Sequence, residues 1–413
     1  MNEFDQEMSA RLNALEEADL LRALREVDSA QAAEIAFEGG SMVNFSSNDY
    51  LGLAGHPALK EAAKEAVDRF GAGAGSARLI CGNLCVHSEL EEALAEFKGC
   101  EAALSFSSGY ATALGVIPAM VGAGDIVVID KLSHASLIDA AKLSGAKLRV
   151  FAHNDLNALE DILKWADRRK AEGKIAADSR ALVITESVFS MDGDLAPLRD
   201  IVKLKEKHGA WLMVDEAHAT GLYGEHRRGL AEEFEVAERV EIQMGTLGKA
   251  LGAAGGYLCG SRALVDLLIN KARSFVFSTA PCPAAAGAAR AGVELVKGGE
   301  GEERRQRLWQ IVDLMKNGLI RIGWSLPPVR SAILPLIVGD EGRAMELSGA
   351  MLEEGVLVPA IRYPTVARGE ARLRLTASAS HDESHLKALF AVLGRMSDGQ
   401  DAAERRTKNP ERA

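Results

Sequence analysis

The sequence contains few cysteines for its length. Five occur among 413 residues, at the scattered positions Cys81, Cys85, Cys100, Cys259 and Cys282. A low and odd count is typical of a cytosolic protein with reduced thiols. Cys81 and Cys85 are closely spaced, but no pair of histidines or cysteines lies nearby to complete a zinc site. We therefore predict no bound metal.

Long apolar runs and an excess of positive charge are also absent. No stretch approaches the ~20 apolar residues that span a bilayer, and the polar start M-N-E-F-D-Q-E-M is unlike a signal peptide. Lys and Arg number 48 against 59 Asp and Glu, a formal net charge of −11. This acidity argues against nucleic acid or an anionic membrane as the main partner. We expect a cytoplasmic protein that binds neither.

Short apolar runs alternate with amphipathic segments through most of the chain. The clearest runs are Ile126–Ile129, Leu182–Thr185, Trp211–Val214 and Tyr257–Cys259, and segments with helical spacing lie between them. Such alternation predicts βαβ units on a mostly parallel sheet. We therefore assign the chain to the α/β class, with a large domain over residues 45–290.

The flanking segments differ from this pattern. Residues 1–44 read as an N-terminal helical segment, with a helix over 7–27 that carries Arg22. Residues 291–395 read as a smaller α+β C-terminal domain, in which Pro335 moves the strand Ile333–Val338 toward a sheet edge. The glycine-rich, charged segment 298–305 reads as a hinge or exposed turn. Residues 396–413 have almost nothing apolar to bury and predict a disordered tail.

The strongest local signal is an apolar strand that ends in Asp215-Glu216-Ala217-His218. In an open parallel sheet, ligands bind outside the carboxyl ends of the strands, so Asp215 and His218 would face a cleft. The simpler interpretation is an aspartate that caps the next helix and a surface histidine. An NTPase is disfavoured, because the segment around Gly248-Lys249 lacks the first glycine and the hydroxyl of a phosphate-binding P-loop.

Lys249 lies within a run of small residues, from Gly245 to Gly256. Small neighbours leave room for a large group beside the amine, and Thr246, three positions earlier, offers a hydroxyl for an anion. A lysine that binds the aldehyde of pyridoxal phosphate needs this arrangement. A solvated surface lysine is the alternative.

The other requirements of a pyridoxal phosphate site are present. Asp215 suits the buried acid that keeps the pyridine nitrogen protonated. Ser107-Ser108-Gly109-Tyr110-Ala111-Thr112 follows a strand-like run and opens a helical stretch, so its amides could bind phosphate. His134, just past the strand Ile126–Ile129, offers a flat partner for the ring. Each feature alone has a simpler explanation, but together they favour this cofactor.

The pattern as a whole resembles the α-oxoamine synthases, fold-type I pyridoxal phosphate enzymes that join an amino acid to an acyl thioester. The resemblance runs from about Leu12 to Leu393. It is carried by Asn44–Gly52, Phe106–Tyr110, Leu132–Ser136, Glu186–Asp194, Val214–His218 and Thr246–Lys249. It implies a fold-type I transferase: a large domain with a mostly parallel sheet and a smaller α+β C-terminal domain.

The resemblance also implies roles for individual residues. Lys249, His134, Asp215 and His218 would be catalytic: Lys249 would hold the cofactor covalently, Asp215 would pair with the ring nitrogen, His218 with the ring hydroxyl, and His134 would stack on the ring. Further cofactor contacts are implied for Gly109, Tyr110, Ser187 and Thr246, and for Ser278 and Thr279 from the neighbouring subunit of a homodimer. Substrate contacts are implied for Arg22, Asn48, Thr365 and Arg374.

The runs Met191–Leu198, Ala360–Val366 and Ala371–Leu375 are most similar to the branch that condenses L-alanine with a pimeloyl thioester in biotin biosynthesis. The acyl carrier, coenzyme A or acyl carrier protein, stays open. Tyr363 stands where many members of this branch have proline, and the Tyr-Pro-Thr-Val wording also occurs in 5-aminolevulinate synthases. The alternative is a sibling activity of the same family, either 5-aminolevulinate synthesis or glycine C-acetyl transfer. A non-catalytic protein is a more remote alternative.

Overall fold

A seven-stranded sheet forms the centre of the molecule, and the computed structural model describes residues 1–18, 20–328 and 330–407 around it. The strand order is β3-β9-β8-β7-β6-β4-β5. The bounds are β3 Ala102–Phe106, β4 Ile126–Asp130, β5 Lys147–Phe151, β6 Ala181–Glu186, β7 Trp211–Asp215, β8 Ile242–Thr246 and β9 Gly256–Gly260.

The sheet is mostly parallel, as predicted. Strands β8, β7, β6, β4 and β5 pair in parallel, and only β9 runs antiparallel to its neighbours β3 and β8. All four predicted apolar runs are strands. Three of these strands continue one residue further, to the acids Asp130, Glu186 and Asp215. The carboxyl edge of the sheet therefore carries a row of buried carboxylates.

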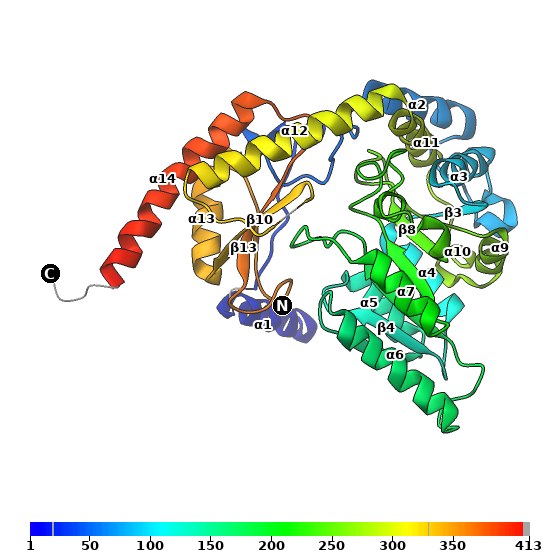
Figure 1. Cartoon of the computed structure of the whole chain (residues 1–413). Helices are drawn as coiled ribbons and strands as arrows, with labels where there is room; N and C mark the ends of the chain where they lie inside the picture. Colours follow the sequence, from blue (N-terminus) through cyan, green and yellow to red (C-terminus); the bar gives the residue numbers. More distant parts are fainter. Residues whose placement is uncertain (19, 329, 408–413) are drawn as a thin grey trace.

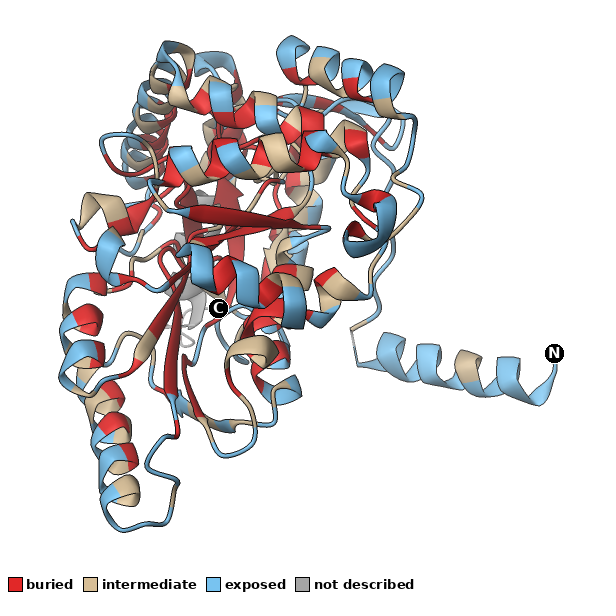
Figure 2. Ribbon diagram, turned by 90° about the vertical axis from the view of Figure 1, so that its right-hand side faces the viewer, coloured by how far each residue is buried: buried red, intermediate tan, exposed pale blue. Residues whose placement is uncertain are grey.

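Helices cover both faces of this sheet because its strands are apolar on both sides. In β4, Ile126 and Val128 pack into one core, and Val127 and Ile129 into the other. One face carries α2 Pro57–Phe70, α3 Cys85–Lys98, α6 Leu156–Ala171, α7 Leu198–Lys207 and α11 Pro283–Lys297; the other carries α4 Gly109–Met120, α5 Ala135–Leu143, α9 Arg262–Lys271 and α10 Arg273–Val276. Figure 2 shows that these helices bury the sides that face the strands. The short helices η1 Arg78–Gly82, α8 Leu230–Glu233 and η2 Ala237–Arg239 lie in the connections.

A smaller α+β unit lies beside the large one (Figure 1). It holds two three-stranded sheets, β10-β13-β12 and β1-β2-β11. Their bounds are β1 Glu34–Phe37, β2 Gly40–Asn44, β10 Ile333–Gly339, β11 Val356–Leu357, β12 Ala360–Ile361 and β13 Ala371–Thr376, and the helices are α12 Gly299–Arg321, α13 Glu341–Glu353 and α14 Glu383–Thr407. Strand β10, which contains Pro335, is an edge strand as predicted.

Two predicted boundaries are wrong. The division at residues 290 and 291 falls inside α11, which packs on α2 and α3 of the large unit. Residues 1–44 are not only helical, because β2 pairs with β11 and so joins the small unit. The apolar face of α11 and the strand pairing of β2, rather than their place in the sequence, decide where they pack.

The hinge or exposed turn predicted over 298–305 is confined to the exposed Gly298 between α11 and α12, because the rest of the segment is helical. Glu300 and Glu302 in the first turn of α12 favour helix at its positive end. At Gly301 an added Cβ would lie 2.4 Å from the Val296 carbonyl oxygen. Glycine is therefore needed for close packing of α12 against the end of α11, not for an exposed turn.

The helix predicted over residues 7–27 is shorter than expected. Helix α1 covers Glu3–Glu17, buries no residue and projects from the body (Figure 2). Arg22 lies beyond it and is exposed. Arg25 instead pairs with Glu38 at 3.0 Å, and Val27 bridges to Phe37, so this segment joins the β1–β2 hairpin.

The structure describes only part of the predicted tail, residues 396–413. Helix α14 continues into it as far as Thr407, and residues 408–413 lie outside the described residues. Among the helices of the described residues, none has the length and apolarity to cross a membrane.

Candidate active site

A cavity of about 190 Å³ lies at the carboxyl edge of the large sheet. Its walls come from the ends of β6, β7 and β8 and from the loops and helices that follow β3 and β4. The lining residues are Gly109, Tyr110, His134, Ser136, Glu186, Asp215, Ala217, His218, Met244, Gly245, Thr246 and Lys249. Seven residues predicted for the site therefore line one cavity.

Lys249 and His218 are in direct contact in this cavity. Lys249 Nζ lies 2.7 Å from His218 Nε2, and the hydroxyl of Tyr50 lies 2.5 Å from the other ring nitrogen, Nδ1. Burial lowers the pKa of His218 well below its usual value, with a further contribution from the Lys249 charge. A neutral imidazole donates through one nitrogen and accepts through the other. His218 is therefore held as a neutral ring between an amine and a phenol.

Burial also lowers the pKa of Lys249 to about 8, against the opposing charges of Asp215 and Glu186. One of the small residues after Lys249 packs against the protein instead of leaving room for a ligand. At Gly252, with φ of +68°, an added Cβ would lie 2.6 Å from Leu53. Part of the glycine-rich run thus admits the segment that carries Asn48 and Tyr50, rather than a ligand.

Two carboxylates lie side by side at the base of the cavity. Glu186 and Asp215 are register partners at the ends of the parallel strands β6 and β7. Burial raises the pKa of Glu186 to about 8, and the negative charge of Asp215 acts in the same direction. Burial also raises the pKa of Asp215, while Lys249 and the Ala217 amide favour its ionised form. Of the two, Asp215 is the better placed to stay ionised beside a cation.

The N-terminus of α4 supplies the anion-binding side of the cavity. Ser108 caps this helix by accepting from the Ala111 amide at 3.0 Å. The amides of Gly109 and Tyr110 belong to the first turn, whose N–H groups have no partner within a helix. Thr246 lines the same side, where its hydroxyl donates to the Gly255 carbonyl at 3.0 Å. The arrangement suits a phosphate group.

His134 and Ser187 are placed differently from each other. His134 caps α5, its backbone N–H donates to Glu186 Oε1 at 2.6 Å, and the residue lines the cavity. Ser187 is fully buried, does not line the cavity, and donates to the Asp215 carbonyl oxygen at 3.2 Å. Ser187 thus supports the backbone of Asp215.

Arg374 is buried close to the cavity and lies on β13 of the small unit. Its guanidinium donates to the Ser190 carbonyl at 2.7 Å, to Thr376 Oγ1 at 3.0 Å and to Asn48 Oδ1 at 3.2 Å. The charge of Arg374 contributes to the lowered pKa of both His218 and Lys249. Asn48 and Arg374 are therefore together and near the amine.

Besides Ser187, Asn48 and Arg374, four more predicted residues are absent from the cavity lining within one chain. Thr279 is exposed and forms an isolated bridge with Ala77, and Ser278 donates to the Thr279 carbonyl. Thr365 and Arg22 are exposed.

Known proteins match nearly the whole of this architecture. The sequence model for aminotransferase class I and II matches residues 40–393. The chain belongs to this family. It is 49% identical over 389 residues to the 8-amino-7-oxononanoate synthase of Geobacter sulfurreducens, covering 94% of this chain and 97% of that one. It is 45% identical over 387 residues to that of Symbiobacterium thermophilum, covering 93% and 96%.

Solved structures of family enzymes share the fold. A serine palmitoyltransferase from S. paucimobilis with a bound PLP–myriocin aldimine has a TM-score of 0.88 at 26% identity, covering 97% of this chain and 99% of that one. The 8-amino-7-oxononanoate synthase of Francisella tularensis has a TM-score of 0.73 at 26% identity, covering 87% and 98%. The predicted fold class and family are confirmed.

Two residues at or beside this cavity, Glu186 and Tyr50, are not among those predicted from the sequence. Glu186 ends β6 as Asp215 ends β7, so the strand-end argument for Asp215 applies to it as well. Tyr50 meets His218 across 168 positions of the chain. No local pattern predicts that contact.

Proposed function

We propose that this chain binds pyridoxal phosphate and condenses L-alanine with a pimeloyl thioester. The products would be 8-amino-7-oxononanoate, CO₂ and the free thiol, in biotin biosynthesis. The observation that carries the proposal is the cavity itself, where an amine, a buried carboxylate and a helix N-terminus converge in a chain 49% identical to an 8-amino-7-oxononanoate synthase.

The residues present fit the cofactor. Lys249 offers an amine for its aldehyde, Asp215 a carboxylate for its ring nitrogen, and the α4 amides with Thr246 donors for its phosphate. When bound, pyridoxal phosphate supplies an electron sink for the carbanion that forms at Cα of the amino acid.

Lys249 is suited to move the Cα proton. An amine with a pKa of about 8 is partly neutral near physiological pH, and a base is most effective when its pKa lies close to the working pH. His218, 2.7 Å from this amine and held neutral, fixes its direction without competing for the positive charge. Tyr50 in turn orients the His218 ring.

Arg374 is suited to hold the carboxylate of the amino acid. A guanidinium has five N–H donors. Its contacts to Ser190, Thr376 and Asn48 use one donor on each nitrogen, and Tyr50 interacts with the same guanidinium. Two parallel donors match a carboxylate. Such a grip fixes which bond of Cα faces the cofactor.

A second copy of the protein would complete the binding sites for the acyl group and for the cofactor phosphate. Leu79 and Ile80 of η1 and Phe277 are large exposed apolar residues, and the Ala77–Thr279 bridge brings their segments together. An apolar patch of this kind indicates a protein interface. In the homodimer that we propose, Ser278 and Thr279 would reach the partner's phosphate, and Arg22 and Thr365 would meet the pimeloyl thioester, carried by coenzyme A or acyl carrier protein.

A sibling activity is the second candidate, because solved structures similar to this chain include serine palmitoyltransferases. A matrix of glycine, L-alanine and L-serine against acetyl, succinyl, pimeloyl and palmitoyl thioesters separates the two. We expect L-alanine with the pimeloyl thioester to give the highest kcat/KM. A higher kcat/KM for any other pair would make that pair the preferred substrates. If no combination of amino acid and thioester is turned over, the proposed condensation is refuted.

A further inference from the structure

A small hairpin lies between the two units of the molecule, directly after β6. Val188 bridges to Leu195, the Phe189 amide donates to the Asp194 carbonyl at 3.0 Å, and the Gly193 amide donates to the Phe189 carbonyl at 2.9 Å. We call residues 188–195 the 188–195 hairpin. It contains the Met-Asp-Gly-Asp run, to which neither the proposed chemistry nor the cavity gives a function.

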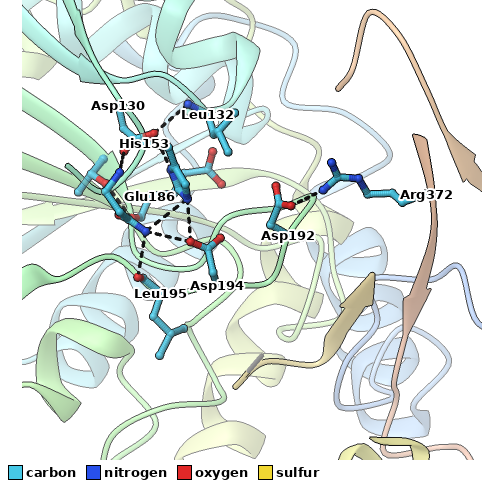
Figure 3. A network of polar contacts seen from close by, with 10 residues as sticks. Asp130, Leu132, His153, Glu186, Asp192, Asp194, Leu195 and Arg372 are labelled. Atoms are coloured by element: carbon cyan, nitrogen blue, oxygen red, sulfur yellow. Dashed lines mark hydrogen bonds and ion pairs between the residues drawn. The ribbon is translucent and has the colours of Figure 1, made fainter. Parts of the chain in front are cut away.

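The base of the hairpin is fastened to the large unit by His153 (Figure 3). His153 Nε2 lies 2.7 Å from Asp194 Oδ2, and Nδ1 lies 2.9 Å from Asp130 Oδ1. The edge of its ring meets Phe189, with ring centroids 4.4 Å apart. Burial opposes its charged form, but the hydrogen bonds to the two carboxylates raise the pKa of His153 to about 10. A cationic His153 therefore joins the hairpin to the end of β4.

The tip of the hairpin is fastened to the small unit. Asp192 forms an ion pair with Arg372, which projects from β13 as Figure 3 shows. The Ser190 carbonyl accepts from Nε of Arg374, two residues further along the same strand. At Gly193, with φ of +69°, an added Cβ would lie 2.4 Å from Ser331 Oγ. The tip thus packs tightly against the start of β10, the strand that pairs with β13, and β13 carries both arginines.

We propose that the 188–195 hairpin positions Arg374 for the carboxylate of the amino acid, with Asp192 and His153 as positioning residues. This inference rests on the proposed function, since Arg374 is the carboxylate-binding group there. The ion pair at Arg372 fixes the register of β13 against the tip. The Ser190 carbonyl then fixes the plane of the Arg374 guanidinium, and with it the direction of the N–H groups on its two terminal nitrogens.

The decisive variant is Asp192→Asn, which removes the ion pair but keeps the size of the side chain. Asp200→Asn is the matched control, because Asp200 forms an exposed pair with Lys203 on α7. On purified holoenzyme, binding of glycine, L-alanine and L-serine is followed through the absorbance change of the cofactor. Ethylamine, which is L-alanine without its carboxylate, is titrated in parallel.

We expect Asp192→Asn to weaken binding of the preferred amino acid about tenfold, since a 1 Å misplacement of a positioning group can cost up to ~100-fold. Ethylamine binding, cofactor content and KM for the thioester should match the wild type, and Asp200→Asn should change none of these. Arg372→Lys keeps the charge without the planar fork and should act in the same direction. It also serves as the test if Asp192→Asn does not fold.

Two outcomes would overturn the inference. Equal weakening for the amino acid and ethylamine would show a general loss of structure, and unchanged amino-acid binding would show that the hairpin does not act on Arg374. The amino acid that the wild type binds most tightly tests the proposed substrate. The effect of the hairpin is tested separately, because the dissociation constants of variant and wild type are compared for whichever amino acid binds. If no amino acid binds the wild type, both proposals fall.

Discussion

The amine of Lys249 lies 2.7 Å from Nε2 of His218, and the Tyr50 hydroxyl lies 2.5 Å from Nδ1 of the same ring. This contact joins the glycine-rich loop after β8 to the segment that precedes α2. The ring is neutral and buried, so it directs the amine without adding a charge. The contacts of Lys249 therefore extend through His218 to a tyrosine that no motif near the lysine contains.

The first prediction concerns the pH dependence of cofactor capture by apoprotein. Only the neutral amine attacks an aldehyde, and burial lowers the pKa of Lys249 to about 8. The rate of capture of pyridoxal phosphate should rise about tenfold per pH unit below that value and level off above it, whereas an ordinary lysine titrates near ~10.4. Stopped-flow absorbance measures this rate. A midpoint near 10 would contradict the assignment, and Lys249→Ala should form no adduct that borohydride can reduce.

The second prediction concerns Glu186, which burial and the Asp215 charge hold protonated near neutral pH. Glu186→Gln resembles the protonated acid, so turnover at pH 7 should stay within about threefold of the wild type, under ~1 kcal/mol in activation free energy. Above pH 8 the wild type gains a second negative charge beside Asp215, and the variant does not. A pH–rate profile with identical alkaline limbs for both proteins would show that Glu186 does not titrate there.

The third prediction concerns the ion pair between Lys98 and Glu216, which are 2.5 Å apart and each only 1% exposed. Glu216 also accepts from the Ala231 amide at 2.8 Å, so the pair holds the turn after Asp215. Lys98→Met should lower the free energy of unfolding by about 3–5 kcal/mol, because it leaves a buried charge without a partner. Urea denaturation measures this. Lys203→Met, which removes an exposed pair with Asp200, should lower the free energy of unfolding by under ~1 kcal/mol. Equal losses for the two variants would argue against a stabilising Lys98–Glu216 pair.

The fourth prediction concerns the composite site of the proposed homodimer. Lys249→Ala should be inactive, and Thr279→Asp should also be inactive because it places a negative charge against the partner's phosphate. When the two variants are mixed and reassociated at random, about half of the dimers are hybrids. Each hybrid has one intact site out of two, so roughly a quarter of wild-type activity should return. If mixtures stay inactive while hybrid dimers form, Thr279 does not act across the interface.

Much of the site is predictable because its residues follow strand ends. Asp215, His134 and Gly109 each lie at or within a few residues of a strand end, and the carboxyl ends of these strands meet at one edge of the sheet. The strands themselves are predictable because they are buried on both faces and read as continuous apolar runs. Lys249 is recognisable through its small neighbours, although Gly252 serves packing against Leu53.

The remainder depends on contacts between distant parts of the chain. Arg22 was placed on a helix from leucine spacing, but Leu24 finds no core to cover it and the helix ends at Glu17. Tyr50 and the 188–195 hairpin act through partners far away in sequence. Ser278, Thr279, Thr365 and Arg22 can contribute only if a second chain or a substrate brings them to the cavity, so their functions stay predictions.

The most direct test of the proposed reaction follows the carboxyl carbon of L-alanine. Holoenzyme is incubated with L-alanine labelled with ¹³C at the carboxyl group, with and without the pimeloyl thioester, and CO₂ and products are analysed by mass spectrometry. The proposed reaction releases one labelled CO₂ for each unlabelled 8-amino-7-oxononanoate, and we expect no release without the thioester. Label retained in the product, or labelled CO₂ released without the thioester, would contradict it.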